Sequence, residues 1–183
     1  LRKAYFHTYW NAFQPNSAMD IRSRELGKNM LTNRRGDNVQ DWDARVKDRI
    51  QKLSPTEIGY QRVQTVTMNG VAQKLVEHET ILEVQLTKPI APKSSVTLSL
   101  QFEAQVPVQI RRSGRDNTEG VRYSMSQWYP KMVEYDYQGW NTNPYIAREF
   151  YGVWGNYDVT IDIDKNYMVA ATGVLQNANN KPS

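Results

Sequence analysis

The chain of 183 residues contains no cysteine, and this absence excludes several kinds of chemistry. Without thiols there are no disulfides, no thiolate zinc ligands and no cysteine nucleophile. Histidine is scarce as well, since only His7 and His78 occur, and neither belongs to a His-Glu-x-x-His zinc motif. Glycine-rich phosphate loops and Gly-x-Ser-x-Gly elbows are also missing. The sequence therefore predicts no catalytic centre and no cofactor in this chain.

Long apolar runs are lacking too. No stretch could span a bilayer, no signal peptide is visible, and the first residue is Leu1, which suggests a chain processed or cut from a longer protein. The excess of positive charge is small, with 23 Lys and Arg against 19 Asp and Glu. Basic pairs occur at Arg34-Arg35 and Arg111-Arg112, but acids are interspersed elsewhere. We therefore expect no membrane span and no nucleic-acid partner.

The sequence does contain stretches in which apolar and polar side chains alternate. Residues 96–106 alternate apolar and polar throughout, which predicts a strand with one buried and one solvated face. Asn69-Gly70 is a strong hairpin signal between strand-like runs at 60–68 and 71–78. Further strands are predicted at residues 5–10, 80–86, 121–126, 157–164 and 168–175, and a polar tail at 177–183.

One helix is predicted within this β pattern. Apolar residues recur at helical spacing from Val39 to Leu53, and Pro55 ends the run. We expect a helix over residues 39–53 that packs its apolar stripe, including Trp42, on the sheet; the alternative is a partner-binding helix led by Trp42. Residues 17–56 resemble an insertion between strands, and residues 1–183 are predicted to form a single β-domain.

Two sets of polar residues have both a structural and a functional interpretation. His7 could be a metal ligand or a general base, but with no partner at ligand spacing it is better explained as a packed strand histidine. Asp158, Asp162 and Asp164 could suggest a calcium site, but they alternate along a predicted strand and lack the spacing of a calcium loop. A solvated strand face explains them better.

Aromatic residues crowd the stretch from Trp128 to Trp154. Exposed rings could stack on sugars or grip a peptide, whereas buried rings would pin a loop onto the sheet or onto a neighbouring domain. We expect most of the rings to be buried, with Trp140 and Tyr145 facing outward.

Three local motifs resemble, in order, the N-terminal β-domain of zinc aminopeptidases of the aminopeptidase N type. The first is Phe6–Phe13, a strand that ends in Asn-Ala-Phe. The second is a Lys-Pro-x-x-Pro turn at 88–92 before a long alternating strand. The third is the aromatic-Pro-x-x-x-acid step in Ser126–Asp136, Ser-Gln-Trp-Tyr-Pro-Lys-Met-Val-Glu-Tyr-Asp. The resemblance excludes the insertion, and Lys131 departs from the small residue of the family.

The resemblance implies a saddle-like, two-sheet β-sandwich with one inserted α-helix. It further implies that the domain packs on a separate catalytic domain of the same polypeptide, that the zinc lies in that domain, and that the substrate is a peptide. In this family a Gln or Glu before the aromatic-Pro step holds the free amino terminus of the substrate. The corresponding candidates are Glu119 and Gln127. A periplasmic or secreted bacterial enzyme would be expected.

Two other functions remain open: a free-standing β-sandwich module that binds glycans or peptides, and a scaffold domain of a non-catalytic relative. An exposed aromatic platform would favour the glycan module. Because the opening strands of the family are missing, the strand at Tyr5–Trp10 is expected to have a free edge. We therefore expect self-association through this edge or through the aromatic face at 128–154.

Overall fold

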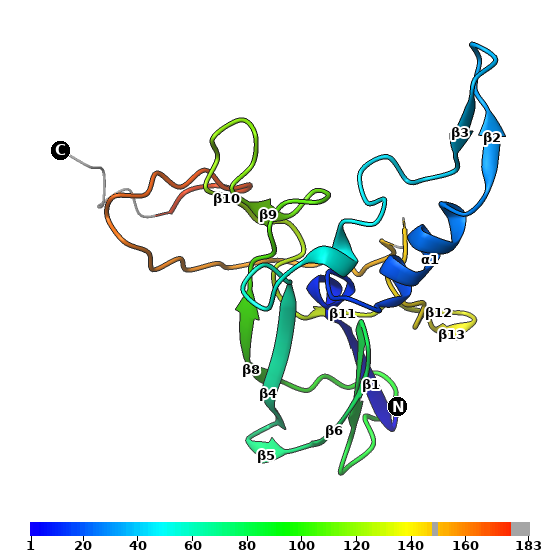
Figure 1. Cartoon of the computed structure of the whole chain (residues 1–183). Helices are drawn as coiled ribbons and strands as arrows, with labels where there is room; N and C mark the ends of the chain where they lie inside the picture. Colours follow the sequence, from blue (N-terminus) through cyan, green and yellow to red (C-terminus); the bar gives the residue numbers. More distant parts are fainter. Residues whose placement is uncertain (148–149, 177–183) are drawn as a thin grey trace. The chain divides into compact units, whose positions relative to one another are not determined.

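The computed structural model describes residues 1–147 and 150–176 and is mainly β, as predicted (Figure 1). The chain divides into two units, Leu1–Val153 and Trp154–Ser183, which are described separately. The single domain over residues 1–183 stays a prediction. All strands and the α-helix of the described residues belong to the first unit.

The first sheet has the order β11-β1-β7-β6 and is antiparallel. Its strands are β1 (Lys3–His7), β6 (Lys74–His78), β7 (Ile81–Gln85) and β11 (Lys131–Met132). Since β1 pairs on both sides, the expected free edge at Tyr5–Trp10 is wrong. The strand is also shorter than predicted, because Tyr9–Ala12 forms a 3₁₀ helix, η1, that turns the chain away from the sheet.

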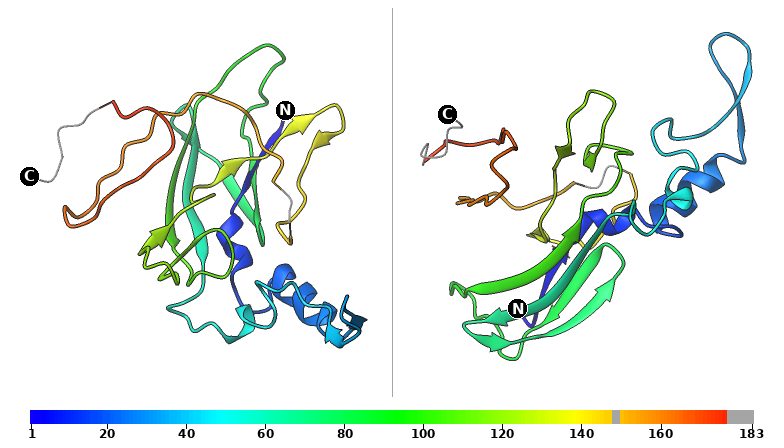
Figure 2. Two further views of the ribbon diagram at one scale, coloured as in Figure 1. Left: turned by 90° about the horizontal axis from the view of Figure 1, so that it is seen from above. Right: turned by 60° about the vertical axis from the view of Figure 1, so that its left-hand side comes forward.

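The second sheet has the order β5-β4-β8, with β4 at Tyr60–Met68, β5 at Val71–Ala72 and β8 at Leu98–Gln105. The Asn69-Gly70 turn is confirmed, and both residues have the positive φ that it requires. The two sheets enclose one apolar core, and the outer face of β4 and β8 is polar, so the β-sandwich-like fold is confirmed (Figure 2). The core residues are Ala4, Phe6, Val63, Val66, Leu82 and Val84.

The helix predicted at residues 39–53 is wrong. The α-helix, α1, lies at Ala18–Leu26, where the Ser17 side chain accepts a hydrogen bond from the backbone of Asp20 at 3.2 Å and caps the first turn. Residues 39–53 instead contain the end of β3 (Asn38–Gln40), a run of turns, and the 3₁₀ helix η2 (Ile50–Lys52). Lys47 adopts a left-handed conformation with φ of 46°, which no α-helix allows.

The apolar side chains of this region are nevertheless buried in part. Val46 and Ile50 join a second core with η1 and α1, while Trp42 is half-buried against Gly27. The buried members of this core are Tyr9, Trp10, Ala12, Phe13, Met19, Val46, Ile50, Ile110 and Tyr145. Val46 and Ile50 are therefore buried as the apolar spacing predicted, but turns rather than a helix place them in the core.

Three short hairpins project from the first unit. Strand β2 (Met30–Thr32) pairs with β3, and this hairpin extends away from the rest of the unit (Figures 1 and 2). Strand β9 (Gly114–Arg115) pairs with β10 (Tyr123–Ser124), and β12 (Tyr135–Asp136) pairs with β13 (Gly139–Trp140).

The second unit contains no strand among residues 154–176, so the strands predicted at 157–164 and 168–175 are wrong. A turn joins the two stretches, with the Tyr167 amide donating to the Asp164 carbonyl at 3.0 Å. The apolar side chains on both stretches are exposed, since neither stretch has a sheet to pack on within the described residues. The predicted tail at 177–183 lies outside the described residues.

Candidate functional site

A small cavity lies next to the start of the Ser126–Asp136 stretch. Its volume of about 10 Å³ has room for a single water molecule and for no substrate group. Its walls are mostly aromatic, with one cation and several short polar groups at the rim. The lining residues are Tyr9, Trp10, Phe13, Arg112, Ser113, Ser126, Gln127, Tyr145 and Phe150.

Hydrogen bonds from two elements hold this stretch in place. The indole nitrogen of Trp10, in η1, donates to the Ser126 carbonyl at 3.2 Å. The Gln61 side chain, in β4, donates to the Gln127 carbonyl at 3.0 Å. Gln127 itself is left-handed, with φ of 55°, and this conformation turns the chain. The 3₁₀ helix η1 and the second sheet therefore both contribute to placing Gln127 at the wall of the cavity.

The two predicted substrate-binding residues, Glu119 and Gln127, are not brought together. Glu119 is exposed in the turn that joins β9 and β10, next to Gly120, whose amide donates to the Asn117 carbonyl at 3.2 Å. Gln127 follows the opposite end of the same hairpin. A single ligand group could not contact both side chains in this arrangement.

The expectation that Tyr145 faces outward is wrong. Its side chain is 3% exposed, and its amide donates to the Thr80 hydroxyl at 2.8 Å. Its ring meets Tyr9 edge-on, with 5.3 Å between centroids, and Phe150 at 4.8 Å. Burial also raises the pKa of Tyr9 far above its usual value. These three rings form part of the cavity wall and pack the loop onto the core.

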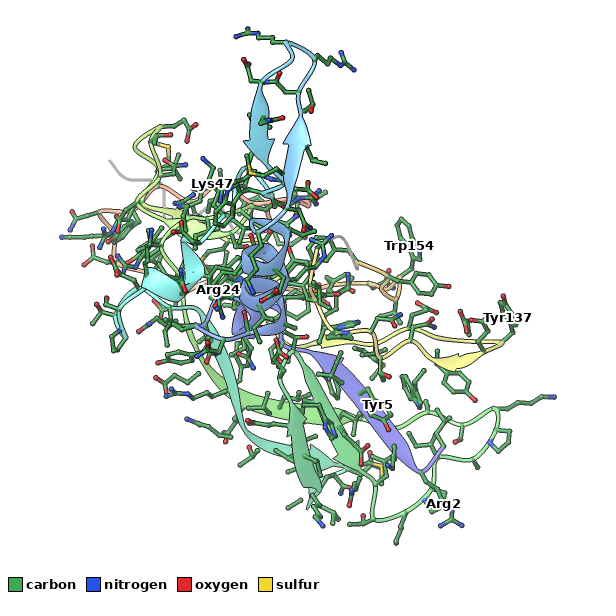
Figure 3. All side chains as sticks on the ribbon, turned by 45° about the vertical axis from the view of Figure 1, so that its right-hand side comes forward. Arg2, Tyr5, Arg24, Lys47, Tyr137 and Trp154 are labelled. Atoms are coloured by element: carbon green, nitrogen blue, oxygen red, sulfur yellow. The ribbon has the colours of Figure 1, made fainter. Side chains whose placement is uncertain are left out.

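Other rings of the loop remain at the surface, and we call Tyr135, Tyr137, Trp140 and Tyr151 the aromatic surface. Tyr137 is 92% exposed at the turn between β12 and β13 and points away from the unit (Figure 3). Tyr135 and Tyr151 are about half exposed, at 50% and 53%. Trp140 is half-buried and meets Tyr5 and Tyr135 edge-on, with centroids 5.6 and 5.0 Å away. The aromatic surface is thus anchored to the first sheet at Trp140.

Tyr5, which contacts Trp140, also belongs to a hydrogen-bond network around the carboxylate of Glu83 on the outer face of the first sheet. Glu83, almost fully buried, accepts from Lys3 at 2.9 Å, from the Tyr5 hydroxyl at 2.8 Å and from Gln85 at 2.9 Å. These bonds, the Lys3 bond foremost, lower the pKa of Glu83 to about 2. A carboxylate that accepts three bonds is held ionised and cannot act as a general base near neutral pH. Sequence reasoning missed it, although β1 and β7 were both predicted.

His7 is buried on β1, and its Nδ1 has no hydrogen-bond partner among the described residues. Within residues 1–147 and 150–176, no group of three or more His, Asp or Glu side chains is placed to hold a metal ion. In the same part of the chain, no helix has the length and apolar character needed to cross a membrane.

Comparisons with models of known protein families, with curated proteins and with solved structures gave no match to this chain.

Proposed function

We propose that the first unit is a non-catalytic, N-terminal accessory domain of a zinc aminopeptidase, and that it packs on a separate catalytic domain. The observation that carries this proposal is the aromatic surface. Tyr135, Tyr137 and Tyr151 are large rings exposed together on a well-packed unit, and contiguous exposed apolar surface is typical of an interaction site. The three sequence motifs that resemble this family supply the identity of the partner.

Within this proposal, Gln127 is the better candidate for the group that binds the amino terminus of the substrate. Its backbone is fixed by the Gln61 hydrogen bond, whereas Glu119 lies on a solvated turn. A neutral amide binds an ammonium group through its carbonyl oxygen. Since the cavity beside Gln127 has room for no more than one water molecule, the pocket for the substrate would be completed by the catalytic domain.

Binding between the separately produced parts tests the proposal. The chain is titrated into the zinc-peptidase domain of the same polypeptide in a calorimeter. We expect binding that Tyr137→Ser/Tyr151→Ser weakens at least about tenfold, because exposed aromatic anchors dominate interfaces. The control is Tyr123→Ser, which removes an exposed ring on the β9–β10 hairpin. Absence of binding, or equal loss in the control, would contradict the proposed interface.

The same surface supports a second candidate, a glycan-binding module. Pyranose rings stack on exposed aromatic side chains, and polar groups beside them accept hydrogen bonds from sugar hydroxyls. Here Asp136 and Gln138 lie in the hairpin that carries the rings, and the Tyr151 hydroxyl is 3.5 Å from the Asp136 carboxylate. Saturable binding of soluble oligosaccharides, lost in Tyr137→Ser/Tyr151→Ser, would favour this candidate over the accessory domain.

A further inference from the structure

The hairpin formed by β2 and β3, which we call the arm (residues 29–41), projects from the first unit (Figure 2). It borders an open groove. The groove has a volume of about 610 Å³. Its lining is apolar at the base and includes one cation, Lys47, which lies near the base of the arm in Figure 3. The lining residues include Met30, Val39, Gln40, Trp42, Ala44 and Lys47.

The floor of the groove is held in a fixed shape. The Trp42 ring lies against Gly27, where an added Cβ would come within 2.7 Å of the ring. Its indole nitrogen donates to the Gln40 side chain, which in turn donates to the Gly27 carbonyl at 2.8 Å. A floor that is already ordered loses little entropy when a ligand binds.

The arm leaves both apolar side chains and backbone groups available. Met30 and Leu31 are 58% and 50% exposed. The hydrogen bonds that close the arm join residues 29 to 41 and 33 to 37, so by the antiparallel alternation Met30 and Thr32 direct their backbone N–H and C=O groups outward. Such an edge can accept a further strand.

The charge of the arm indicates which kind of strand its edge could accept. Arg34 and Arg35 are exposed at its tip and have no ion-pair partner within residues 1–147 and 150–176. A loop that inserts into a membrane carries its apolar residues at the tip, whereas here the apolar residues lie at the base. An extended protein segment that combines apolar and acidic residues fits both ends of the arm.

The second unit contains such a segment at residues 157–164. Val159, Ile161 and Ile163 alternate with three aspartates and Thr160. The three apolar side chains are exposed, and no strand pairs with them among the described residues. Extended, residues 157–164 span roughly 23 Å from the first to the last, against roughly 16 Å from Met30 to Arg35. The segment is therefore long enough to reach from the groove to the cationic tip.

We propose that the arm and its groove bind residues 157–164 of a second copy of this chain. The segment adds as a strand to the edge of the arm, its apolar side chains enter the groove, and the negative charge of Asp158 and Asp162 is attracted to the positive charge of Arg34 and Arg35. This contact uses neither the aromatic surface nor Gln127, so it stands or fails separately from the proposed function.

Sedimentation of the full chain over about 10 to 500 µM tests the proposal, at about 0.05 and 0.5 M salt. We expect association at low salt that weakens at high salt, since exposed charges are screened. Arg34→Glu/Arg35→Glu and Asp158→Lys/Asp162→Lys should each weaken it at least about tenfold. The matched control, Arg62→Glu/Lys74→Glu, changes net charge by the same amount on the sandwich and should associate like the natural chain.

Mixing the two charge-reversed variants gives the decisive result. A mixed pair contains one natural contact and one with both charges reversed, so the equimolar mixture should regain the affinity of the natural chain. A natural chain that stays monomeric at low salt would overturn the proposal. So would unchanged association of either variant, or a mixture no tighter than its components.

Discussion

Acidification should destabilise the fold through His7 well before the carboxylates titrate. The ring is 2% exposed and stacks on Tyr9 with 4.7 Å between centroids. Its Nδ1 lacks a hydrogen-bond partner among the described residues, so nothing compensates a positive charge. Burial, and to a smaller extent the neighbouring charge of Lys131, lower the pKa of His7 from 6.5 to about 4.

The sign and size of the effect follow from these two pKa values. The unfolded chain takes up the proton first as the pH falls, so stability is complete above pH 6.5 and declines between pH 6.5 and 4. Proton linkage gives a loss of about 2 kcal/mol at pH 5 and about 3 kcal/mol at pH 4. A loss of that size is a large part of the stability of a small domain.

Urea unfolding, followed by tryptophan fluorescence from pH 7.5 to 4, measures this loss. His7→Phe keeps a ring against Tyr9 but cannot be protonated, so its stability should stay level between pH 6.5 and 5. His78→Phe changes the exposed histidine of β6 and should follow the natural chain. If the free energy of unfolding falls with pH equally in the natural chain and in His7→Phe, the reasoning is refuted.

Three further substitutions address other contacts. Glu83→Gln removes the ion pair with Lys3 and should lower the free energy of unfolding by about 1–3 kcal/mol at pH 7, measured by urea unfolding. The pKa of Glu83 is lowered from 4.5 to about 2, so the natural chain, unlike the variant, should lose this stabilisation as the pH falls through that range. Gly27→Ala should cost about 1–3 kcal/mol by crowding the Trp42 ring, and a Trp42→Leu background should remove most of the cost in thermal unfolding. Trp10→Phe loses the indole hydrogen bond and should lower stability by about 1–3 kcal/mol in the same assay.

The β-sandwich was predictable because its strands carry their own signals. Strand β8 alternates along its length, and the Asn69-Gly70 turn sets the start of β5 opposite the end of β4. Alternation reports which side chains can share a face, and in a sandwich that face is the core. Both features are local, so one sequence suffices to read them.

The helix was misplaced because buried residues at helical spacing do not require a helix. Val46 and Ile50 are buried, but the left-handed Lys47 between them interrupts any helix. A signal for the true helix is present in the capping pattern at Ser17 and Asp20, but the prediction rested on the apolar spacing further along the chain. The capping pattern marks the helix at Ala18–Leu26, whereas the apolar spacing at 39–53 reflects packing against distant residues.

The site depended on contacts between distant residues, which the sequence does not show. Tyr145 is buried because Tyr9 and Thr80, both remote in sequence, pack and hydrogen-bond with it. The segment 157–164 alternates like a strand, but alternation cannot supply a partner, and the described residues provide none. Gln127 could be named as a candidate, whereas its separation from Glu119 followed only from the hairpin between them.

Hydrolysis of aminoacyl-nitroanilides tests most directly whether the first unit is a non-catalytic accessory domain. The chain, the proposed zinc-peptidase domain and an equimolar mixture of the two are assayed side by side, with zinc content measured in each. We expect no turnover and no stoichiometric zinc from the chain alone, and at least about tenfold more turnover from the mixture than from the peptidase domain. Turnover with stoichiometric zinc in the chain alone, or no gain on mixing, would contradict the account.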